Sequence, residues 1–432
     1  MKIKFEIFPL LLLLLLLAGG LLAQDAESFE VNGLKVIFKK NTATDIIVAN
    51  LYFRGGVSVL DTRNAGIENY ALTVAPKASQ NYPKEKLNAE LESINTQIDH
   101  SSTQDYSSLN LKTVKQNFDK SWQIFTDVVK NPSFNTDDVE LEREKILSGI
   151  RQRHDDPDNY LDELVDQAYF QNHPYNTEVA GNVSTISAFN AEDLKKYYQD
   201  RLQTSDLLLV VVGNIDKEKL QQKVRESFGD LPTGNYQQTL PPEPAHQESS
   251  IKVVQRDLPT NYIMGAYSAP AFQDQDRYAM AIASSILRDR VFEEVRTKRG
   301  LSYAPAAGYR PNFSGMAFIY VTAVDADSTI KVMMNELKRL RDEPISEEDL
   351  QDKVNTFITR HYLGNETNQA QASTLARYEL SGLGYQKAAN FIQNVKSVTP
   401  QDLQDVAQKY INNMQVVIIG NPQELQTSRF FL

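Results

Sequence analysis

The spacing of apolar residues in the first half of the chain switches between that of strands and that of helices. Residues 34–38 and 46–53 are rich in β-branched and aromatic side chains, and the polar turn between them predicts a β-hairpin. The segments with helical spacing are 67–75, 84–94, 114–129, 138–154 and 191–202, and an apolar strand is expected at 207–212. This mixture predicts an α+β domain.

The second half repeats this order. Strands are expected at 251–255 and 262–268, and a helix at 277–298. Three pairs of segments recur in the same order, about 210 residues apart. They are Pro132–Val139 with Pro344–Leu350, Asn190–Leu194 with Thr399–Leu403, and Val210–Asn214 with Val417–Asn421. A repeat of this length predicts an internal duplication that gives two homologous domains.

The first 23 residues have the pattern of a signal peptide and are left out of the predicted fold. Lys2 and Lys4 precede an apolar run over 7–18, and Ala23 offers a small residue for cleavage. This leader predicts export to the periplasm or the cell envelope. An uncleaved anchor is the alternative, because the apolar stretch nearly reaches the ~17 residues that a membrane span needs. The chain has no cysteine, so a lipid on an N-terminal cysteine is excluded.

A linker is expected near the middle of the chain. Residues 232–250 begin with a run too rich in proline and polar residues to continue a helix or a central strand. The predicted N-terminal domain therefore covers 24–231, and the predicted C-terminal domain covers 251–432. With 432 residues and 41% hydrophobic content, the chain can bury two cores of ordinary size.

The charge of the chain narrows its possible partners. The formal net charge is −11, which repels phosphate backbones. The sequence also lacks a basic stripe interleaved with aromatic residues. Nucleic acid is therefore not expected as a partner.

Several segments resemble the M16 family of zinc metallopeptidases, which includes pitrilysin, insulinase and mitochondrial processing peptidase. The matching segments are Arg54–Val57, Ala65–Ile67, His173–Asn176 with Gly181, Val210–Asp216, and Arg296–Tyr303. They extend over nearly the whole chain after the leader. The resemblance implies two similar α+β domains that form a clamshell around a chamber, with the metal in the first domain.

In active members of that family, one helix carries the motif His-x-x-Glu-His. The two histidines bind zinc, and the glutamate deprotonates the metal-bound water. The matching segment of this chain has Asn69 and Thr73 at the histidine positions and Leu72 at that of the base. Gly149 stands where a later helix supplies the third ligand. The resemblance therefore implies a degenerate zinc site and no catalytic residue in this chain alone.

No other side chain is expected to replace these ligands. Glu68 has no metal-bound water to activate, so it is expected to be a solvated helix residue. None of the five histidines has a second histidine three to five residues away, so each is expected to be a surface or hydrogen-bonded residue. They are His100, His154, His173, His246 and His361.

The resemblance also implies a substrate-binding pair in the C-terminal domain. In related peptidases an arginine and a tyrosine seven residues apart hydrogen-bond the carbonyls of the substrate and of the tetrahedral intermediate. Arg296 and Tyr303 have this spacing, and their donors suit a developing oxyanion. The alternative is that Arg296 pairs with Glu293 or Glu294, while Tyr303 starts a strand and packs against Tyr309.

These features favour a non-catalytic, peptide-binding subunit of an exported heterodimeric M16 peptidase. The partner subunit would hold an intact His-x-x-Glu-His motif and its zinc, and this chain would supply Arg296 and Tyr303. Residues 97–102 match the edge strand on which the family binds extended peptides. An inert scaffold or binding protein without a peptidase partner is the alternative, and an active peptidase with unorthodox ligands is a third possibility.

Overall fold

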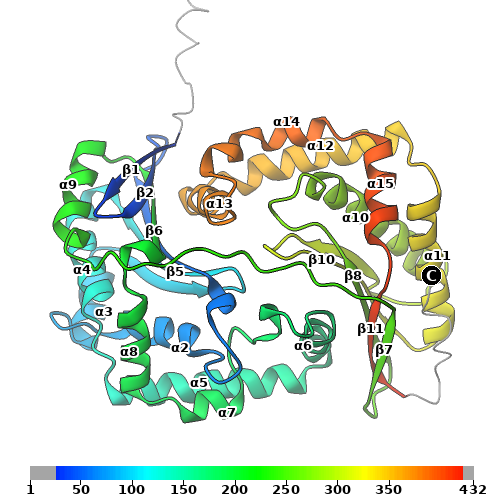
Figure 1. Ribbon diagram of the computed structural model, residues 1–432, viewed down its shortest axis with the longest axis horizontal. Helices are drawn as coiled ribbons and strands as arrows, with labels where there is room; N and C mark the ends of the chain where they lie inside the picture. The colour runs from blue at the N-terminus through cyan, green and yellow to red at the C-terminus, as the bar shows by residue number, and fades with distance from the viewer. Residues whose placement is uncertain (1–25, 422–432) are drawn as a thin grey trace, which may run out of the picture.

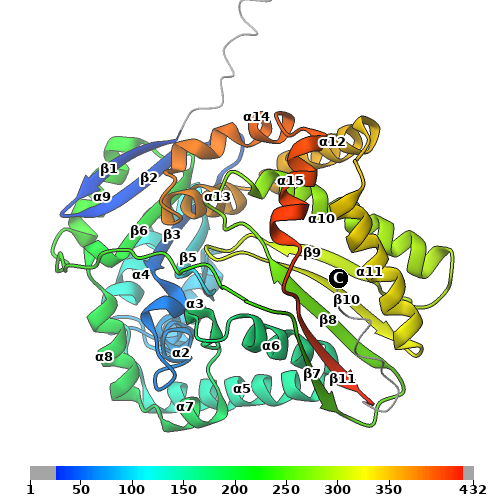
Figure 2. The ribbon, with the colours of Figure 1, turned by 45° about the vertical axis from the view of Figure 1, so that its right-hand side comes forward.

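The computed structural model describes residues 26–421 as two sheets with helices around them. The two halves face each other like the shells of a clam, and a long segment of the chain crosses between them (Figures 1 and 2). The predicted leader, residues 1–23, lies outside the described residues. No helix among the described residues combines the length and apolar character needed to cross a membrane.

The first sheet has six strands in the order β1-β2-β6-β3-β5-β4. Their bounds are Glu27–Val31 (β1), Leu34–Lys40 (β2), Leu207–Gly213 (β6), Ile46–Arg54 (β3), Tyr106–Val114 (β5) and Gln97–Ser102 (β4). The predicted hairpin of β2 with β3 is wrong, because β6 lies between them and pairs with both. Every residue of β6 is buried, and such a continuous apolar run belongs at the centre of a sheet.

The second sheet repeats this topology in the order β7-β11-β8-β10-β9. The bounds are Ser250–Gln255 (β7), Gln415–Gly420 (β11), Asn261–Ser268 (β8), Met316–Ala323 (β10) and Ala306–Arg310 (β9). In the first sheet, β6 lies between β2 and β3; in the second, β11 lies between β7 and β8 in the same way, parallel to β7 and antiparallel to β8. The shared insertion confirms the internal duplication.

The helices of the first half are α2 (Ile67–Val74), α3 (Lys84–Ser93), α4 (Phe118–Lys130), α5 (Thr136–Asp155), α6 (Pro157–Tyr169), α7 (Val183–Ala188), α8 (Ala191–Arg201) and α9 (Lys217–Phe228). Those of the second half are α10 (Arg277–Val291), α11 (Ala326–Asp342), α12 (Glu347–Gly364), α13 (Asn368–Leu380), α14 (Phe391–Lys396) and α15 (Pro400–Tyr410). The helix expected at 114–129 begins later because β5 continues to Val114. The helix expected at 277–298 is α10 followed by a π-helix, Phe292–Thr297.

The polar start signals that recur in the sequence cap corresponding helices. Asn190 caps α8 and Thr399 caps α15, each through a capping box with an aspartate three residues later. The helices that follow the central strands also correspond, because α2 follows β3 and α10 follows β8.

The two halves interlock by exchanging one helix each. Helix α6 of the first half packs on the second sheet, where Leu161 and Val165 join a cluster with Met264 and Val417. Helix α13 of the second half packs on the first sheet, in a cluster that includes Val210, Val212, Leu375 and Ala376. Burying this apolar surface stabilises the closed arrangement.

The segment predicted as a linker contains no helix or strand between Phe228 and Ser250. It nonetheless binds both halves. Arg54 of the first half donates to the Gln238 side chain at 2.9 Å, and Ser314 of the second half donates to the carbonyl of Pro242 at 3.0 Å. The predicted domain bounds, 24–231 and 251–432, remain predictions.

Candidate functional site

The start of α2 is fixed by two glycines. Gly66 has φ 85° and Gly181 has φ 74°, a region that favours glycine. A Cβ added to Gly66 would lie 2.5 Å from the Cα of Gly181, so neither position has room for a side chain. This close approach holds α2 against the segment that leads to α7.

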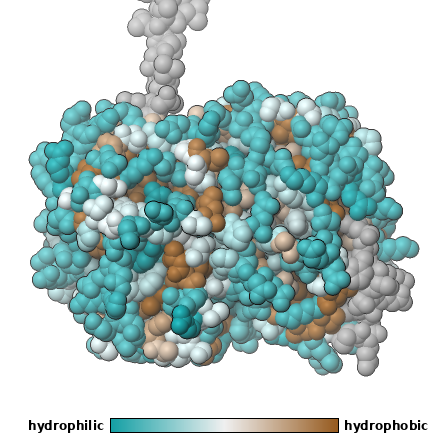
Figure 3. Space-filling view, in the orientation of Figure 1, coloured by the Kyte–Doolittle hydropathy of each residue, from teal (hydrophilic) through white to brown (hydrophobic). Residues whose placement is uncertain are grey.

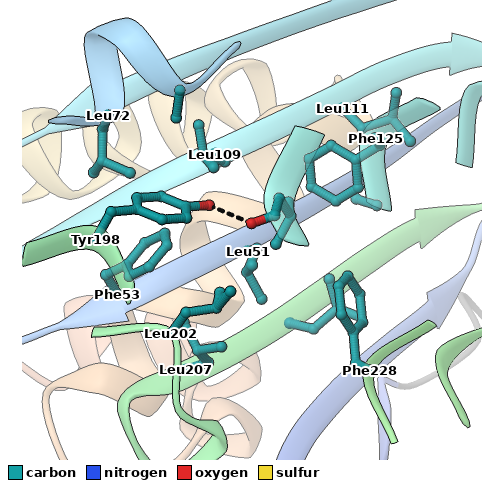
Figure 4. Packing of buried hydrophobic residues seen from close by; sticks show 14 of the residues in the cluster. Leu51, Phe53, Leu72, Leu109, Leu111, Phe125, Tyr198, Leu202, Leu207 and Phe228 are labelled. Carbon is teal, nitrogen blue, oxygen red and sulfur yellow. Dashed lines mark hydrogen bonds between the residues drawn. The ribbon is translucent and has the colours of Figure 1, made fainter. Parts of the chain in front are cut away.

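The residues at the expected zinc positions have taken other roles. Leu72 is 1% exposed and lies in the first hydrophobic core, with Phe53, Leu109 and Tyr198 nearby in Figure 4. The Thr73 hydroxyl donates to the carbonyl of Asn69 at 2.7 Å and lies 3.0 Å from the His100 ring. Burial lowers the pKa of His100, so this imidazole stays neutral near pH 7.

These residues do not fit zinc. Leu72 and Gly149 offer no ligand atom, and the Thr73 hydroxyl already has two partners. Gly149 is exposed on α5, and a Cβ added there would meet nothing within 4 Å. Within residues 26–421 no three His, Cys, Asp or Glu side chains are grouped so that they could hold a metal ion.

The expectation that Glu68 is solvated is wrong. Glu68 is 4% exposed, and its carboxylate accepts a hydrogen bond from the Tyr197 hydroxyl at 2.7 Å. The Arg201 side chain lies 3.5 Å away, and it also binds Asp206 at 2.8 Å. A charge this deeply buried needs such partners. Glu68 therefore ties α2 to α8.

A polar cavity of ≈ 470 Å³ opens beside α2. Asn69 lines it, together with Ser102 at the end of β4 and with Arg153, Asp166 and Glu178. Burial raises the pKa of both Asp166 and Glu178 to about 7. The ion pairs Asp166–Arg310, at 3.2 Å, and Glu178–Arg153, at 3.6 Å, oppose these shifts. No sequence pattern pointed to Asp166 and Glu178, because they lie on separate elements.

Strand β4 forms the edge of the first sheet next to this cavity. It pairs only with β5 among the described strands, and exposed positions alternate with half-buried ones along it. Its outer edge therefore offers backbone donors and acceptors to an extended chain. The structure places the predicted strand, Gln97–Ser102, as expected, and its peptide-binding role remains a prediction.

Arg296 and Tyr303 lie together on the surface of the second half. The Arg296 guanidinium stacks over the Tyr303 ring, 4.1 Å from its centroid, and over the Phe292 ring at 4.9 Å. Tyr303 is 78% exposed. Neither Arg296 nor Tyr303 is among the residues that line the cavity beside Asn69.

The structural alternative for this pair is wrong. Glu294 binds Lys298 and Arg299 instead of Arg296. Tyr303 lies before strand β9, which begins at Ala306. Tyr309, the expected packing partner of Tyr303, instead makes a partly buried hydrogen bond. Its hydroxyl donates to the carbonyl of Pro270 at 2.5 Å.

A π-helix presents the arginine. The Lys298 amide donates to the carbonyl of Glu293, five residues earlier, which widens the last turn. Gly300 then turns the chain with φ 60°, a conformation that glycine adopts without strain. Nothing lies near an added Cβ at Gly300, so backbone conformation and not space favours glycine there.

The five histidines have ordinary partners. His154 faces Glu163 at 3.1 Å, and His173 lies 2.7 Å from the carbonyl of Pro242. His361 stacks on Phe391, and His246 packs on Tyr169. Together with His100, all five histidines therefore have contacts that require no metal ion.

Comparison with known proteins identifies the family. Residues 35–183 match the family described as "Insulinase (Peptidase family M16)", and residues 188–357 match "Peptidase M16 inactive domain". An "Uncharacterized zinc protease" of Rickettsia felis is 22% identical over 93% of this chain and 99% of its own length. The "Non-peptidase homolog YmxG" of Helicobacter pylori is 21% identical over 96% of this chain and 99% of its own.

Solved structures share the fold. A crystal structure described as a peptidase M16 inactive domain from Pseudomonas fluorescens superposes with a TM-score of 0.85 at 18% identity, covering 92% of this chain and 98% of that one. A protease from Helicobacter pylori superposes with a TM-score of 0.84 at 18% identity, covering 92% and 100%. With both halves matched by M16 descriptions, the chain belongs to peptidase family M16.

Proposed function

We propose that this protein is the non-catalytic, peptide-binding subunit of an exported heterodimeric M16 peptidase. The observation that carries the proposal is the Arg296–Tyr303 stack, because Tyr303 is exposed and the half-buried Arg296 forms no ion pair with a carboxylate among the described residues. An arginine fork and a phenol are the donors that an oxyanion needs, and in this chain they face outward. The partner subunit would bring the zinc.

Two further features support the proposal. The edge of β4 is open beside the cavity that Asn69 lines, so an extended peptide has backbone partners there. A relative of similar length bears the name "Non-peptidase homolog". The proposed export rests on the leader sequence alone.

A scaffold without a peptidase partner is the second candidate. It is favoured by the helix exchange of α6 and α13, which joins the two halves through buried apolar clusters. A scaffold has no use for an exposed Arg–Tyr pair, which is why the subunit role is preferred.

The test is peptide hydrolysis by this chain combined with an M16 subunit that has an intact motif. Changing Arg296→Ala together with Tyr303→Phe should lower kcat by about 100-fold or more without preventing assembly. The matched control is Arg299→Ala with Tyr362→Phe, which alters an arginine of the same turn and another exposed tyrosine. Equal rates for the two double variants would refute the proposed role. Zinc bound at one equivalent by the isolated chain would instead support an active peptidase with unorthodox ligands.

A further inference from the structure

The second half contains a cavity of ≈ 260 Å³ that the proposed function does not use. It lies among α10, α12, α13 and α14, the helices labelled in the upper half of Figure 1. The apolar part of its wall comes from Tyr309, Phe357, Phe391 and Val395. His361 lies parallel to the Phe391 ring at 4.4 Å, which adds another flat surface.

One side of this cavity is cationic. Arg277, at the start of α10, is the only buried lysine or arginine in the described part of the chain, at 8% exposure. It donates to neutral groups alone, which include the hydroxyls of Tyr278 at 2.5 Å and Tyr378 at 3.3 Å. Within residues 26–421, no carboxylate lies within ion-pair distance of it. A buried cation without a carboxylate partner is costly.

A second arginine stands beside it. Arg277 and Arg377 both lie over the ring of Phe272, at 4.6 and 4.2 Å from its centroid. Arg377 donates one hydrogen bond, to the carbonyl of Pro311, and leaves most of its five N–H donors available. The two like charges repel each other at this proximity.

The carboxylates near these two arginines accept hydrogen bonds from other groups. Asp274 accepts the Ala271 amide at 2.7 Å. Asp105 accepts the Tyr175 hydroxyl and the Phe313 amide. Neither forms an ion pair with Arg277 or Arg377, so the excess positive charge at the cavity is not neutralised by a direct partner.

We infer that this cavity binds a small carboxylate joined to an apolar group, with the carboxylate at Arg377 and the Tyr378 hydroxyl. The apolar group would lie between Phe357 and Phe391. A guanidinium and a phenol bind carboxylate oxygens by charge-assisted hydrogen bonds, and the aromatic wall excludes water around them. Either the C-terminal residue of a peptide or a free aliphatic acid has this chemistry.

Calorimetric titration of the purified full chain tests the inference. N-acetyl-phenylalanine represents a peptide C-terminus, and octanoate represents a free aliphatic acid. At least one of the two acids should bind. The acid that binds more tightly indicates whether the ligand is a peptide C-terminus or a free aliphatic acid. N-acetyl-phenylalaninamide has the same ring without the charge, so it should bind about 10-fold more weakly or worse than the acid.

Two variants locate the site. Arg377→Gln should weaken binding of the acid by about 10- to 100-fold, and Ala281→Leu should weaken it by filling the cavity that Ala281 lines. Arg256→Gln is the matched control, because Arg256 likewise lies over an aromatic ring, that of Tyr160, and donates to a carbonyl, but does not line the cavity. The inference fails if neither acid binds the unaltered chain, if the amide binds as tightly as the acid, or if inorganic phosphate binds as tightly. It also fails if folded Arg377→Gln protein binds like the control.

Discussion

Helices α2 and α10 hold equivalent places in the two halves, each after the central strand of its sheet, yet they serve different purposes. Helix α2 is short and turned inward, with Leu72 in the core and Glu68 bound to α8. Helix α10 is longer and continues into the π-helix that carries Arg296. The face of the molecule seen in Figure 3 is mostly hydrophilic, with several apolar patches.

The contrast shows which half of this duplicated chain has side chains available for binding another molecule. In the first half, the positions of the expected metal site have become structural, through core packing and buried hydrogen bonds. In the second half, Arg296 and Tyr303 contribute little to the core and stay available to another molecule. The predictions below test this division, beginning with the largest expected effect.

Removing the buried carboxylate of α2 should have the largest effect. Glu68→Ala leaves Arg201 with one carboxylate partner instead of two, in a site where its side chain is nearly buried. The free energy of unfolding should fall by about 3–5 kcal/mol, measured by urea denaturation. The control Glu144→Ala, at an exposed position of α5, should change it by less than about 0.5 kcal/mol. Equal effects would mean that Glu68 is not structural.

Two further positions of the expected zinc site should respond in opposite directions to alanine. Leu72→Ala opens a cavity in the core and should cost about 2–4 kcal/mol. Gly149→Ala meets open space on an exposed helix face and should stabilise the protein by about 1 kcal/mol. Both changes are read from the same urea unfolding curves. A loss of stability in Gly149→Ala would indicate that this position packs against something.

The acids of the polar cavity should give an effect of another kind, a dependence of stability on pH. Asp166 and Glu178 have pKa values of about 7 in the folded protein, well above those of unfolded carboxyls. The folded state therefore binds more protons, and its stability should fall as pH rises from about 4 to 7. The free energy of unfolding, measured by urea denaturation at a series of pH values, should therefore decrease through this window. Asp166→Asn with Glu178→Gln should flatten the curve; an unchanged slope would contradict the assignment.

Much of the architecture was readable from the sequence because local signals decide it. The recurring caps at Asn190 and Thr399 correspond to real helix starts, and the apolar run of β6 is a buried strand. The pairing of strands was not readable, because the hairpin expected from neighbouring β2 and β3 is broken by β6, which arrives more than 150 residues later.

The buried contacts of the candidate site could not be predicted, because no local pattern in the sequence reveals them. Glu68 looks like a surface residue of α2 until Tyr197 and Arg201 of α8 are placed beside it. Likewise, the apolar face of α6 does not reveal, from the sequence alone, that this helix packs on the sheet of the other half. The spacing of Arg296 and Tyr303 was visible, but their stacking depends on the π-helix and the turn at Gly300.

The central claim is that this chain works beside a zinc-bearing relative. The most direct measurement is gentle purification from the native envelope fraction, followed by mass spectrometry of any stoichiometric companion. The account predicts a companion of the M16 family with an intact His-x-x-Glu-His motif. A companion without that motif, or recovery of the chain alone, would contradict it and favour the scaffold.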